Sequence, residues 1–587
     1  MMCKVNVVSI AMLAASLVRA DATFPGNGGD LANATDWGGT VPDSSETVTV
    51  NKAGKYELST DKTFGRLLVK AAGCELAFGA STLTTTTNKA SGVEVELGNG
   101  GQTVFSGGIF DLSSTGHFHP AYNGKDMETI LTNGCVVTNV STFYGARKAN
   151  GSRVKLAGGA KVYVSELRLC NDKGDDNLLE ISDGAQMYVS GNIYSDANGT
   201  EGAYGGNTLR VAGSGSRLQR NSTSYSMQLG FRQSGHTFHV ADGATVDFQG
   251  KGPLNLGGGG GSIGATNNAL VVENAATATI PYIAFNTANN RVVVSNATLS
   301  CATSLSLGKS DTCTGNVFRV IGPQATLSLP SADFYGSGAE NVFSLEGGAA
   351  WNAMRDLLFT NTHHSVFRVT GAGTVFGDVA GANRFYVGDK NNKVTDACAS
   401  NTVEVLDGAV FNAGRICLMG IGNALAVSNG TVNVGAGGDL VALRVGYRLD
   451  GTDSTNTTGC LLRICGETPQ VNVLSGGSVI CQFANNSVLR FEIPAQGYAK
   501  GHVPFRVTQK TLSFDSTCRL EIACEEFARE TGGRLTLMET GTDISEDVAN
   551  YLRNSVNELP PGCALVVEKR AVKLVVPRRK GMIVRIK

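Results

Sequence analysis

The feature that most constrains this chain is a phrase that recurs from about residue 150 to residue 465. Each copy begins with a polar residue, usually Asn, followed by alternating apolar positions, a tight turn rich in Gly, and a second alternating run. A third short run follows and often ends on Gly. Alternation with a period of two is typical of strands that bury one face. The phrase therefore predicts three short strands per repeat, joined by turns.

The second apolar position of the first strand gives the phase of the repeat. It falls at Leu156, Ile181, Val211, Val240, Val272, Val294, Val320, Leu345, Val369, Val405, Val427 and Ile464. These twelve positions are 22 to 37 residues apart, with a mean of 28, which indicates a solenoid, a propeller or another array. The shortest copies have no room for a four-stranded propeller blade, but three strands make one coil of a parallel β-helix. We therefore predict an all-β, right-handed parallel β-helix (a solenoid) with regular repeats over residues 151–494, because parallel crossovers are right-handed.

One polar position keeps a fixed phase against this pattern, two residues before the first apolar position. Eight of the twelve copies carry Asn there, namely Asn177, Asn207, Asn268, Asn290, Asn316, Asn341, Asn401 and Asn423. The other four carry Ser152, His236, Ser365 and Cys460. Asn tolerates the left-handed conformation of a sharp corner, and stacked amides can hydrogen-bond to one another. We predict a structural ladder of asparagines at one corner of the coils.

The two ends of the chain depart from the phrase. Residues 21–150 are strand-rich but irregular, and we expect an N-terminal cap and the first irregular coils there, because an open coil exposes unpaired strand edges. Residues 495–587 predict a small mixed region of strands with one helix at 544–558 and a basic tail. Asp543 and Glu546 resemble a capping box, and Val548, Leu552 and Val556 share one apolar face.

The first 20 residues predict a secretory signal. An apolar stretch of about 14 residues follows Lys4, and Val18 and Ala20 place small residues where a signal peptidase cuts, before Asp21. This stretch is short for a membrane span, and no later stretch is long and apolar enough for one. We therefore expect an exported chain without a transmembrane segment once the signal is removed.

Composition excludes several classes of function. Lys and Arg together number 49 against 50 Asp and Glu, so no overall basic field exists to hold nucleic acid. Of 14 Cys, Cys3 belongs to the signal, and the remainder form no CxxC pair, which argues against zinc ribbons and a disulfide scaffold. We expect them to act as small buried apolar residues, although pairing of Cys460 or Cys465 with Cys481 stays open.

Ionisable residues that could carry chemistry are few. Asp175-Asp176 and Arg585-Ile586-Lys587 match fragments of the polygalacturonase pattern, but about 400 residues separate them, and its Asn-Thr-Asp and Gly-His-Gly elements are missing. Three further carboxylates each precede the Gly of the tight turn, which indicates turn chemistry rather than a shared calcium ion. These are Asp183, Asp242 and Asp407.

The histidines and tryptophans also give no clear site. His117 and His119 would lie on one side of a strand, and His363-His364 falls at a loop, but neither pair has an evident third ligand, so we expect surface polar residues. Trp351 falls at an inward position and should be core, while a Tyr-lined groove for sugars stays open. We therefore predict no catalytic, cofactor-binding or metal-binding residues, and no cofactor.

The repeated phrase, written ΦxΦG…NxΦxVxxGAxΦxΦ with Φ apolar, resembles the β-helix repeats of bacterial autotransporter passengers and adhesin-like surface proteins. Trp37-Gly38-Gly39, followed by Val41-Pro42 and the run ETVTV, resembles their opening strand. The resemblance implies a secreted or surface-displayed bacterial protein, although this sequence shows no run of barrel strands like the one that ends an autotransporter.

Two hypotheses about function follow from the fold and the resemblance. The first is a structural or adhesive protein with a surface, glycan or protein ligand. The second is a carbohydrate-active enzyme or glycan-binding module on the same scaffold. Carboxylates and basic residues that cluster in a cleft on one outer sheet would favour the second hypothesis, because catalysis needs ionisable groups that converge.

Overall fold

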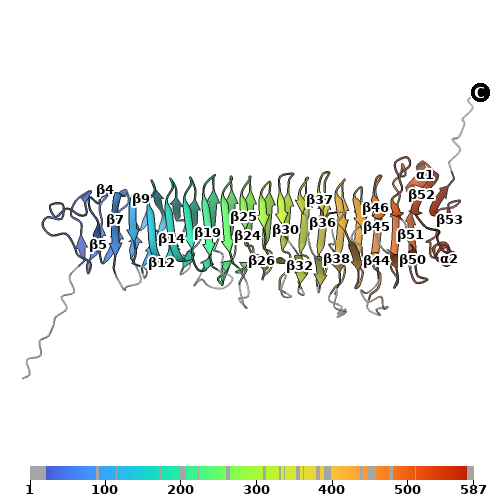
Figure 1. The fold of residues 1–587 in the computed structure, drawn as a ribbon, viewed down its shortest axis with the longest axis horizontal. Coiled ribbons are helices and arrows are strands. Elements are labelled where there is room, and N and C mark those ends of the chain that lie inside the picture. Colours follow the sequence, from blue (N-terminus) through green and yellow to red (C-terminus); the bar gives the residue numbers. More distant parts are fainter. Residues whose placement is uncertain are drawn as a thin grey trace, which may run out of the picture.

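The structure is a computed structural model of the 587-residue chain (Figure 1). It describes residues 21–577 except 87–91, 114–115, 172–173, 197–204, 223, 251, 259–264, 308–311, 330–331, 336–337, 352–356, 361, 379–383, 389–397, 436–440, 447–456, 475–479 and 509–510. The predicted signal at 1–20 and the predicted basic tail at 578–587 therefore lie outside the described residues.

The described chain is almost entirely β-structure, arranged as a long stack of short strands that lie across the axis of the molecule (Figure 1). In the regular region each strand pairs in parallel with the strand three elements later in the chain. Three ladders result, one for each strand of the repeat, and we call them the first, second and third sheets. This pairing is consistent with the predicted β-helix solenoid.

The first sheet contains the strand that follows the Asn corner. Its members are β2 (Gly29–Asp30), β4 (Gly54–Glu57), β7 (Cys74–Thr85), β9 (Asn99–Asp111), β11 (Lys125–Thr132), β13 (Arg153–Leu156), β15 (Leu178–Ile181), β18 (Thr208–Ala212), β21 (Thr237–Ala241), β24 (Ala269–Glu273), β27 (Arg291–Ser295), β30 (Val317–Ile321), β33 (Val342–Glu346), β36 (Val366–Thr370), β39 (Thr402–Leu406), β42 (Ala424–Ser428), β45 (Leu461–Cys465), β48 (Val488–Glu492) and β51 (Arg519–Ala523).

The second sheet follows the Gly turn and also includes the far ends of β7 and β9. Its members are β5 (Lys62–Phe64), β12 (Val136–Arg147), β14 (Lys161–Asn171), β16 (Gln186–Val189), β19 (Arg217–Asn221), β22 (Thr245–Gln249), β25 (Thr277–Thr279), β28 (Thr298–Ser300), β31 (Thr326–Ser328), β34 (Ala350–Trp351), β37 (Val375–Phe376), β40 (Val410–Ala413), β43 (Thr431–Val434), β46 (Gln470–Val473), β49 (Phe505–Val507) and β52 (Gly533–Thr540).

The third sheet completes each repeat and shares the long strands β12 and β14 with the second. Its other members are β1 (Ala22–Thr23), β3 (Thr47–Val50), β6 (Arg66–Val69), β8 (Val93–Val95), β10 (His117–His119), β17 (Ile193–Tyr194), β20 (Met227–Leu229), β23 (Leu254–Leu256), β26 (Tyr282–Phe285), β29 (Ser304–Leu307), β32 (Ala332–Tyr335), β35 (Leu357–Thr360), β38 (Arg384–Val387), β41 (Arg415–Leu418), β44 (Val441–Val445), β47 (Ile480–Phe483) and β50 (Leu512–Phe514).

The predicted phase of the repeat is confirmed. All twelve positions from Leu156 to Ile464 are completely buried, and each is the register partner of the next. They form one continuous column in the core. Elsewhere in the core, rings stack in the same way, as where Phe343 lies parallel to Phe318 and Phe367 at centroid distances of 4.9 and 5.0 Å. The predicted core position of Trp351 is confirmed, with 1 % exposed.

Glycine at the end of the third strand is needed because the next coil comes close. Gly230 has a φ of 78°, and a Cβ there would collide with the side chain of Asn268. At Gly257, with a φ of 85°, a Cβ would collide with Thr287. The recurrent Gly of the third run thus leaves room for the corner of the following coil.

The C-terminal end changes the direction of pairing. β52 pairs in parallel with β49 on one edge, but its other edge pairs antiparallel with β54 (Ala571–Val576), which pairs antiparallel with β53 (Ala564–Glu568). This hairpin gives the last coil an edge partner, as a cap requires.

The prediction of one helix at 544–558 was wrong in number and in bounds. The structure has α1 (Glu525–Glu530) and α2 (Glu546–Asn554) among its described residues. The cap of α2 is Ser545, whose Oγ accepts from the N–H of Val548, rather than Asp543. Val556 lies beyond the helix and forms a parallel bridge with Leu520, so pairing with β51 ends the helix early.

Inward and outward neighbours on one strand should differ sharply in sensitivity. Val405 is fully buried, whereas Glu404 is partly exposed and its Oε2 accepts a hydrogen bond from Arg368 Nε at 2.6 Å. We expect Val405→Asp to cost at least ~3 kcal/mol, because it buries an unpaired carboxylate. Glu404→Gln should cost less than about 1 kcal/mol, because an exposed ion pair contributes little. Urea unfolding followed by circular dichroism measures both, and similar losses would contradict the assigned strand phase.

Candidate functional site

The corner position forms a continuous chain of hydrogen bonds along the axis. From Ser152 to Asn401, the backbone N–H of each corner residue donates to a side-chain atom of the corner residue one coil later, at 2.8 to 3.2 Å, and Asn423 is the last acceptor. The acceptor is Asn Oδ1 in most steps, His236 Nδ1 in one and Ser365 Oγ in another. All eight predicted asparagines are buried. We call this chain the corner ladder.

The side chains of the ladder also donate. Asn177 Nδ2 donates to the carbonyl of Ala149 at 2.8 Å, and Asn423 Nδ2 donates to that of Cys398 at 3.1 Å. At these two corners the amide satisfies a buried N–H of one coil and a buried carbonyl near the same corner, whereas the Nδ2 groups of Asn316 and Asn341 are buried without a partner among the described residues. An apolar residue would leave both groups unpaired in the core, which is costly.

The expected reason for Asn at the corner was wrong in one respect. The left-handed conformation belongs to the residue before the ladder, not to the ladder residue itself. These preceding residues have φ values of 50 to 59° where they are not Gly, and they are Asp176, Asn267, Asn289, Glu340, His364 and Ser400. The ladder position selects Asn for its hydrogen bonds, and the position before it makes the turn.

We expect the ladder to stabilise the core more than a similar contact at the surface. Asn290 Oδ1 accepts from the N–H and Nδ2 of Asn268, at 2.9 and 3.0 Å, so Asn290→Ala should cost about 1–3 kcal/mol. A matched control is Asn472, whose Nδ2 donates to Asn433 Oδ1 at 2.8 Å in a part-buried site. Asn472→Ala should cost less than ~1 kcal/mol, because water can replace the contact. Equal shifts of the urea midpoint would refute a special role for the corner.

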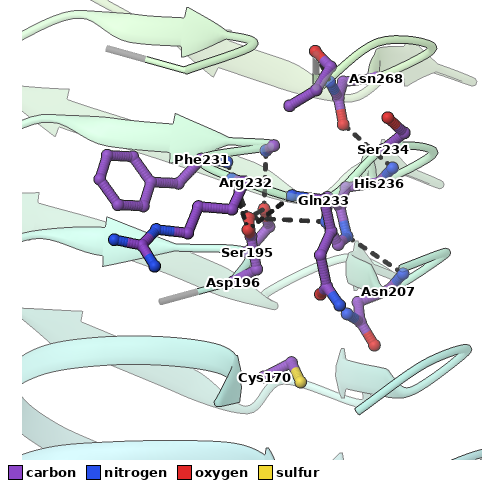
Figure 2. Close-up of polar contacts among 12 residues, drawn as sticks. Cys170, Ser195, Asp196, Asn207, Phe231, Arg232, Gln233, Ser234, His236 and Asn268 are labelled. Atoms are coloured by element: carbon purple, nitrogen blue, oxygen red, sulfur yellow. Dashed lines mark hydrogen bonds and ion pairs between the residues drawn. The ribbon is translucent and has the colours of Figure 1, made fainter. Parts of the chain in front are cut away.

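His236 connects the ladder to a buried carboxylate (Figure 2). Its Nδ1 accepts the N–H of Asn207 at 3.2 Å, which requires that nitrogen to be unprotonated. Its Nε2 lies 3.5 Å from Asp196 Oδ1, and neither side chain is more than 1 % exposed. Burial lowers the pKa of His236, although the Asp196 carboxylate opposes that shift. The ring is therefore neutral, with its remaining proton directed at Asp196.

Asp196 organises the turn of the following coil. Its two carboxylate oxygens accept the N–H groups of Phe231, Arg232 and Gln233 at 2.6 to 2.8 Å (Figure 2). Ser195 Oγ donates to Asp196 Oδ1 at 2.8 Å and accepts the N–H of Gly230 at 2.7 Å. Three successive backbone N–H groups around one carboxylate make an anion nest, here occupied by a side chain of the chain itself.

This group contains Ser, Asp and His, but its geometry differs from that of a hydrolytic triad. Ser195 Oγ bonds to Asp196 and to the backbone, whereas His236 bonds to Asn207 and approaches Asp196. A nucleophile must contact its base and be reachable by substrate. Ser195 and His236 are both 0 % exposed, so the group positions backbone rather than reacting.

The neutral state of His236 predicts a pH dependence of stability. Its pKa is lowered in the folded chain, so unfolding lets the ring take up a proton below its ordinary value of about 6.5. Stability from this group is fully present above about pH 6.5 and is lost as pH falls further. We expect His236→Asn, which keeps an acceptor for Asn207, to flatten the fall in thermal midpoint between about pH 6.5 and 5. The same slope in both proteins would contradict this assignment.

A second polar group lies on the outward face of the third sheet, in the N-terminal coils. We call it the arginine–aromatic cluster. It consists of His117, His119, Tyr122, Tyr144, Arg147, Glu166, Arg168, Tyr194, Phe231 and Arg232. In the next four coils, the same outward row carries Gln228, Asn255, Ala284 and Ser306, none of which is ionisable.

The members of the cluster stack on one another. The rings of His119 and Tyr144 lie parallel with centroids 4.5 Å apart, and the guanidinium of Arg168 lies 5.6 Å from the Tyr144 ring and 5.8 Å from the Tyr194 ring. Glu166 Oε1 accepts from Arg168 Nε at 2.5 Å. Cation–π and ring contacts therefore occupy much of the aromatic surface. The rings of Tyr144 and Tyr194 thus make their contacts within the cluster.

The histidines of this cluster are not the surface residues that we expected. His119 is completely buried and His117 is half-buried, because Tyr144 contacts both rings. Burial and the nearby Arg147 and Arg168 lower the pKa of His117. Within the described part of the chain, no group of three or more His, Cys, Asp or Glu side chains is placed to hold a metal ion.

The other candidate carboxylates serve turns. Asp183, Asp242 and Asp407 have φ values of 52, 57 and 54°, so each occupies a left-handed turn position before its Gly. Asp176 is also left-handed, and the N–H of Asp175 is held by Asn150 Oδ1 at 3.0 Å. His364 makes the turn before Ser365. The predicted terminal run Arg585-Ile586-Lys587 lies outside the described residues.

Most of the cysteines also lie in the buried interior. The thirteen cysteines among the described residues are free thiols, and most of them are buried, including Cys460 and Cys481. Burial raises the pKa of Cys460 to about 12, so this thiol stays protonated.

In the region that the structure describes, no helix is long and apolar enough to cross a bilayer.

Comparison with known proteins adds no assignment, since the chain matches no protein-family model and no curated protein sequence.

Proposed function

We propose that this chain is an exported rod with a structural or adhesive role, secreted or displayed at the cell surface, and that its coils close into a right-handed parallel β-helix. The observation that carries the proposal is the unbroken axial order of the stack. The corner ladder and the core column run through successive coils without interruption. Such a structure transmits position over a distance, which suits reach and display.

The dimensions support a spacer role. The first sheet joins nineteen strands from β2 to β51, which spans about 86 Å at the ~4.8 Å spacing of paired strands. The chain enters and leaves at opposite ends of this stack (Figure 1). A rod of this kind separates whatever is attached to its two ends.

The polar groups described above support a non-catalytic role. Recurrent polar residues satisfy buried backbone groups, and the Ser195–Asp196–His236 group is sealed in the core. The arginine–aromatic cluster gathers one carboxylate, Glu166, and several basic groups on one outer sheet, but Glu166 pairs with Arg168 within the cluster. Catalysis would require groups that converge on an accessible space.

Processing and shape together test the proposal. Protein recovered from the producing cell should begin at or near Asp21 and should be accessible to protease added outside the cell. Small-angle scattering of the purified mature chain should give an elongated particle with a length of about 86 Å plus its end structures.

Two outcomes would contradict the proposal. Mature protein that keeps Met1 and stays inside the cell would remove export. Release of products from a panel of neutral and acidic polysaccharides would establish an enzyme, and loss of that turnover in Glu166→Gln would place the active site in the arginine–aromatic cluster. Arg368→Gln, on the first sheet, is the matched control for a charge change far from the cluster.

A further inference from the structure

A shallow groove of about 320 Å³ lies beside a β-bulge on the outer side of the second sheet. β12 and β14 pair in register at Val137 and again at Val140, but the register shifts between these two residues. Thr138 and Asn139 therefore face a single residue, Tyr163, of the next strand. A bulge bends the strand locally and re-aims its side chains.

Two tyrosines form a platform in this groove. Tyr163 and Tyr188 are register partners on neighbouring coils, and their rings lie parallel, with centroids 4.9 Å apart and planes within 6°. Tyr163 is 40 % exposed, among the highest values for a large apolar residue in the described chain. Its neighbour across the bulge, Asn139, donates Nδ2 to Asp111 Oδ1 at 2.8 Å, which ties that side chain to the preceding coil. Tyr163 therefore keeps a large exposed area beside its ring partner.

The remaining walls of the groove carry no charge and include three valines, Val140, Val164 and Val189. They come from β12, the interior of β14, the ends of β16 and β19, and Ser190 after β16. The hydrogen-bonding side chains are those of Thr138, Asn139, Ser165, Ser190 and Asn221. Among the described residues that line the groove, no Asp, Glu, Lys, Arg or His occurs. Hydroxyl and amide groups offer donors and acceptors without a net charge.

We propose that this groove binds a neutral glycan chain, with a pyranose ring lying against the outer face of Tyr163 and sugar hydroxyls bonded to Ser165, Ser190 and Asn221. Aromatic side chains supply a flat apolar face and, in Tyr, a polar edge, which matches the two faces of a sugar ring. Uncharged partners favour a neutral ligand, because they offer no compensation for a desolvated carboxylate.

The groove differs in this respect from the arginine–aromatic cluster on the adjoining sheet. There, guanidinium groups and neighbouring rings occupy the faces of Tyr144 and Tyr194. In the groove, Tyr163 contacts one ring and keeps a large exposed area. The inference rests on the adhesive form of the proposed function and names the class of ligand for it.

The test uses the full mature chain and defined hexasaccharides. Cello-, xylo-, manno- and laminarihexaose are titrated by isothermal calorimetry, and hexagalacturonate serves as the acidic counterpart. We expect at least one neutral hexasaccharide to bind. Tyr163→Ala should weaken that binding roughly tenfold, the effect of losing about 1.4 kcal/mol of ring contact, while Tyr163→Phe should stay within about threefold of the parent.

The controls separate a binding role from a structural one. Tyr551→Ala removes an equally exposed ring from α2, at the far end of the stack, and should leave binding unchanged. Thermal unfolding of each variant checks that Tyr163→Ala remains folded, and Asn221→Ala supplies a second, milder loss at the groove. Weaker binding in folded Tyr163→Ala and Asn221→Ala, but not in Tyr551→Ala, is the supporting result.

Three results would contradict the proposed glycan site. Binding of hexagalacturonate alone, binding of no hexasaccharide, or neutral-glycan binding that survives Tyr163→Ala would each overturn the inference. Scattering data from the same preparations keep this outcome distinct from the proposed function. A long rod that binds no glycan would refute the groove as a glycan site and leave the structural role intact.

Discussion

The stacking of the coils depends on a hydrogen-bond acceptor for the backbone N–H that is buried at the sharpest corner. Backbone N–H groups within the strands donate to neighbouring strands of the sheets. The backbone N–H of a corner residue points along the axis and has no strand partner. Here the side chain of the next coil accepts it, ten times in succession between Ser152 and Asn423. A buried N–H without a partner would cost about 1–3 kcal/mol, so this contact decides which residues the corner accepts. The sheets, the core column and the position of the Gly turns all depend on coils that meet at that corner.

Departures from Asn in the ladder are informative because each brings its own compensation. Ser365 is shorter, and its Oγ pairs with Thr362 Oγ1 as well as accepting the N–H of Asn341. His236 is longer, and its second nitrogen reaches Asp196, whose carboxylate then holds the turn at Phe231 to Gln233. In both cases the ladder position keeps an acceptor for the N–H of the preceding coil.

The sequence allowed the repeating part of the structure to be predicted, because each strand phrase is local and recurs with one phase. The alternation of apolar residues was enough to predict the twelve core positions. The place of the three aspartates before Gly was enough to predict that they lie in turns. Features that depend on two distant segments left no such signal. Asp196 and His236 are 40 residues apart, and nothing near either residue indicates that they meet. The groove at Tyr163 depends on one extra residue in β12, which looks like an ordinary irregularity until the register is known. Helix α1 is too short to show a periodic pattern. The cap of α2 was predicted at Asp543, which precedes the observed cap Ser545.

The orientation of the strands has a mechanical consequence. Strands lie across the long axis, and the first and last described strands lie at opposite ends of the stack (Figure 1). Tension applied between those ends pulls along the hydrogen bonds, so the coils peel apart in turn instead of shearing together. Each coil that opens releases some 22 to 37 residues of slack and lowers the load on its neighbours. Under sustained force between its ends, this rod would lengthen in steps and dissipate work.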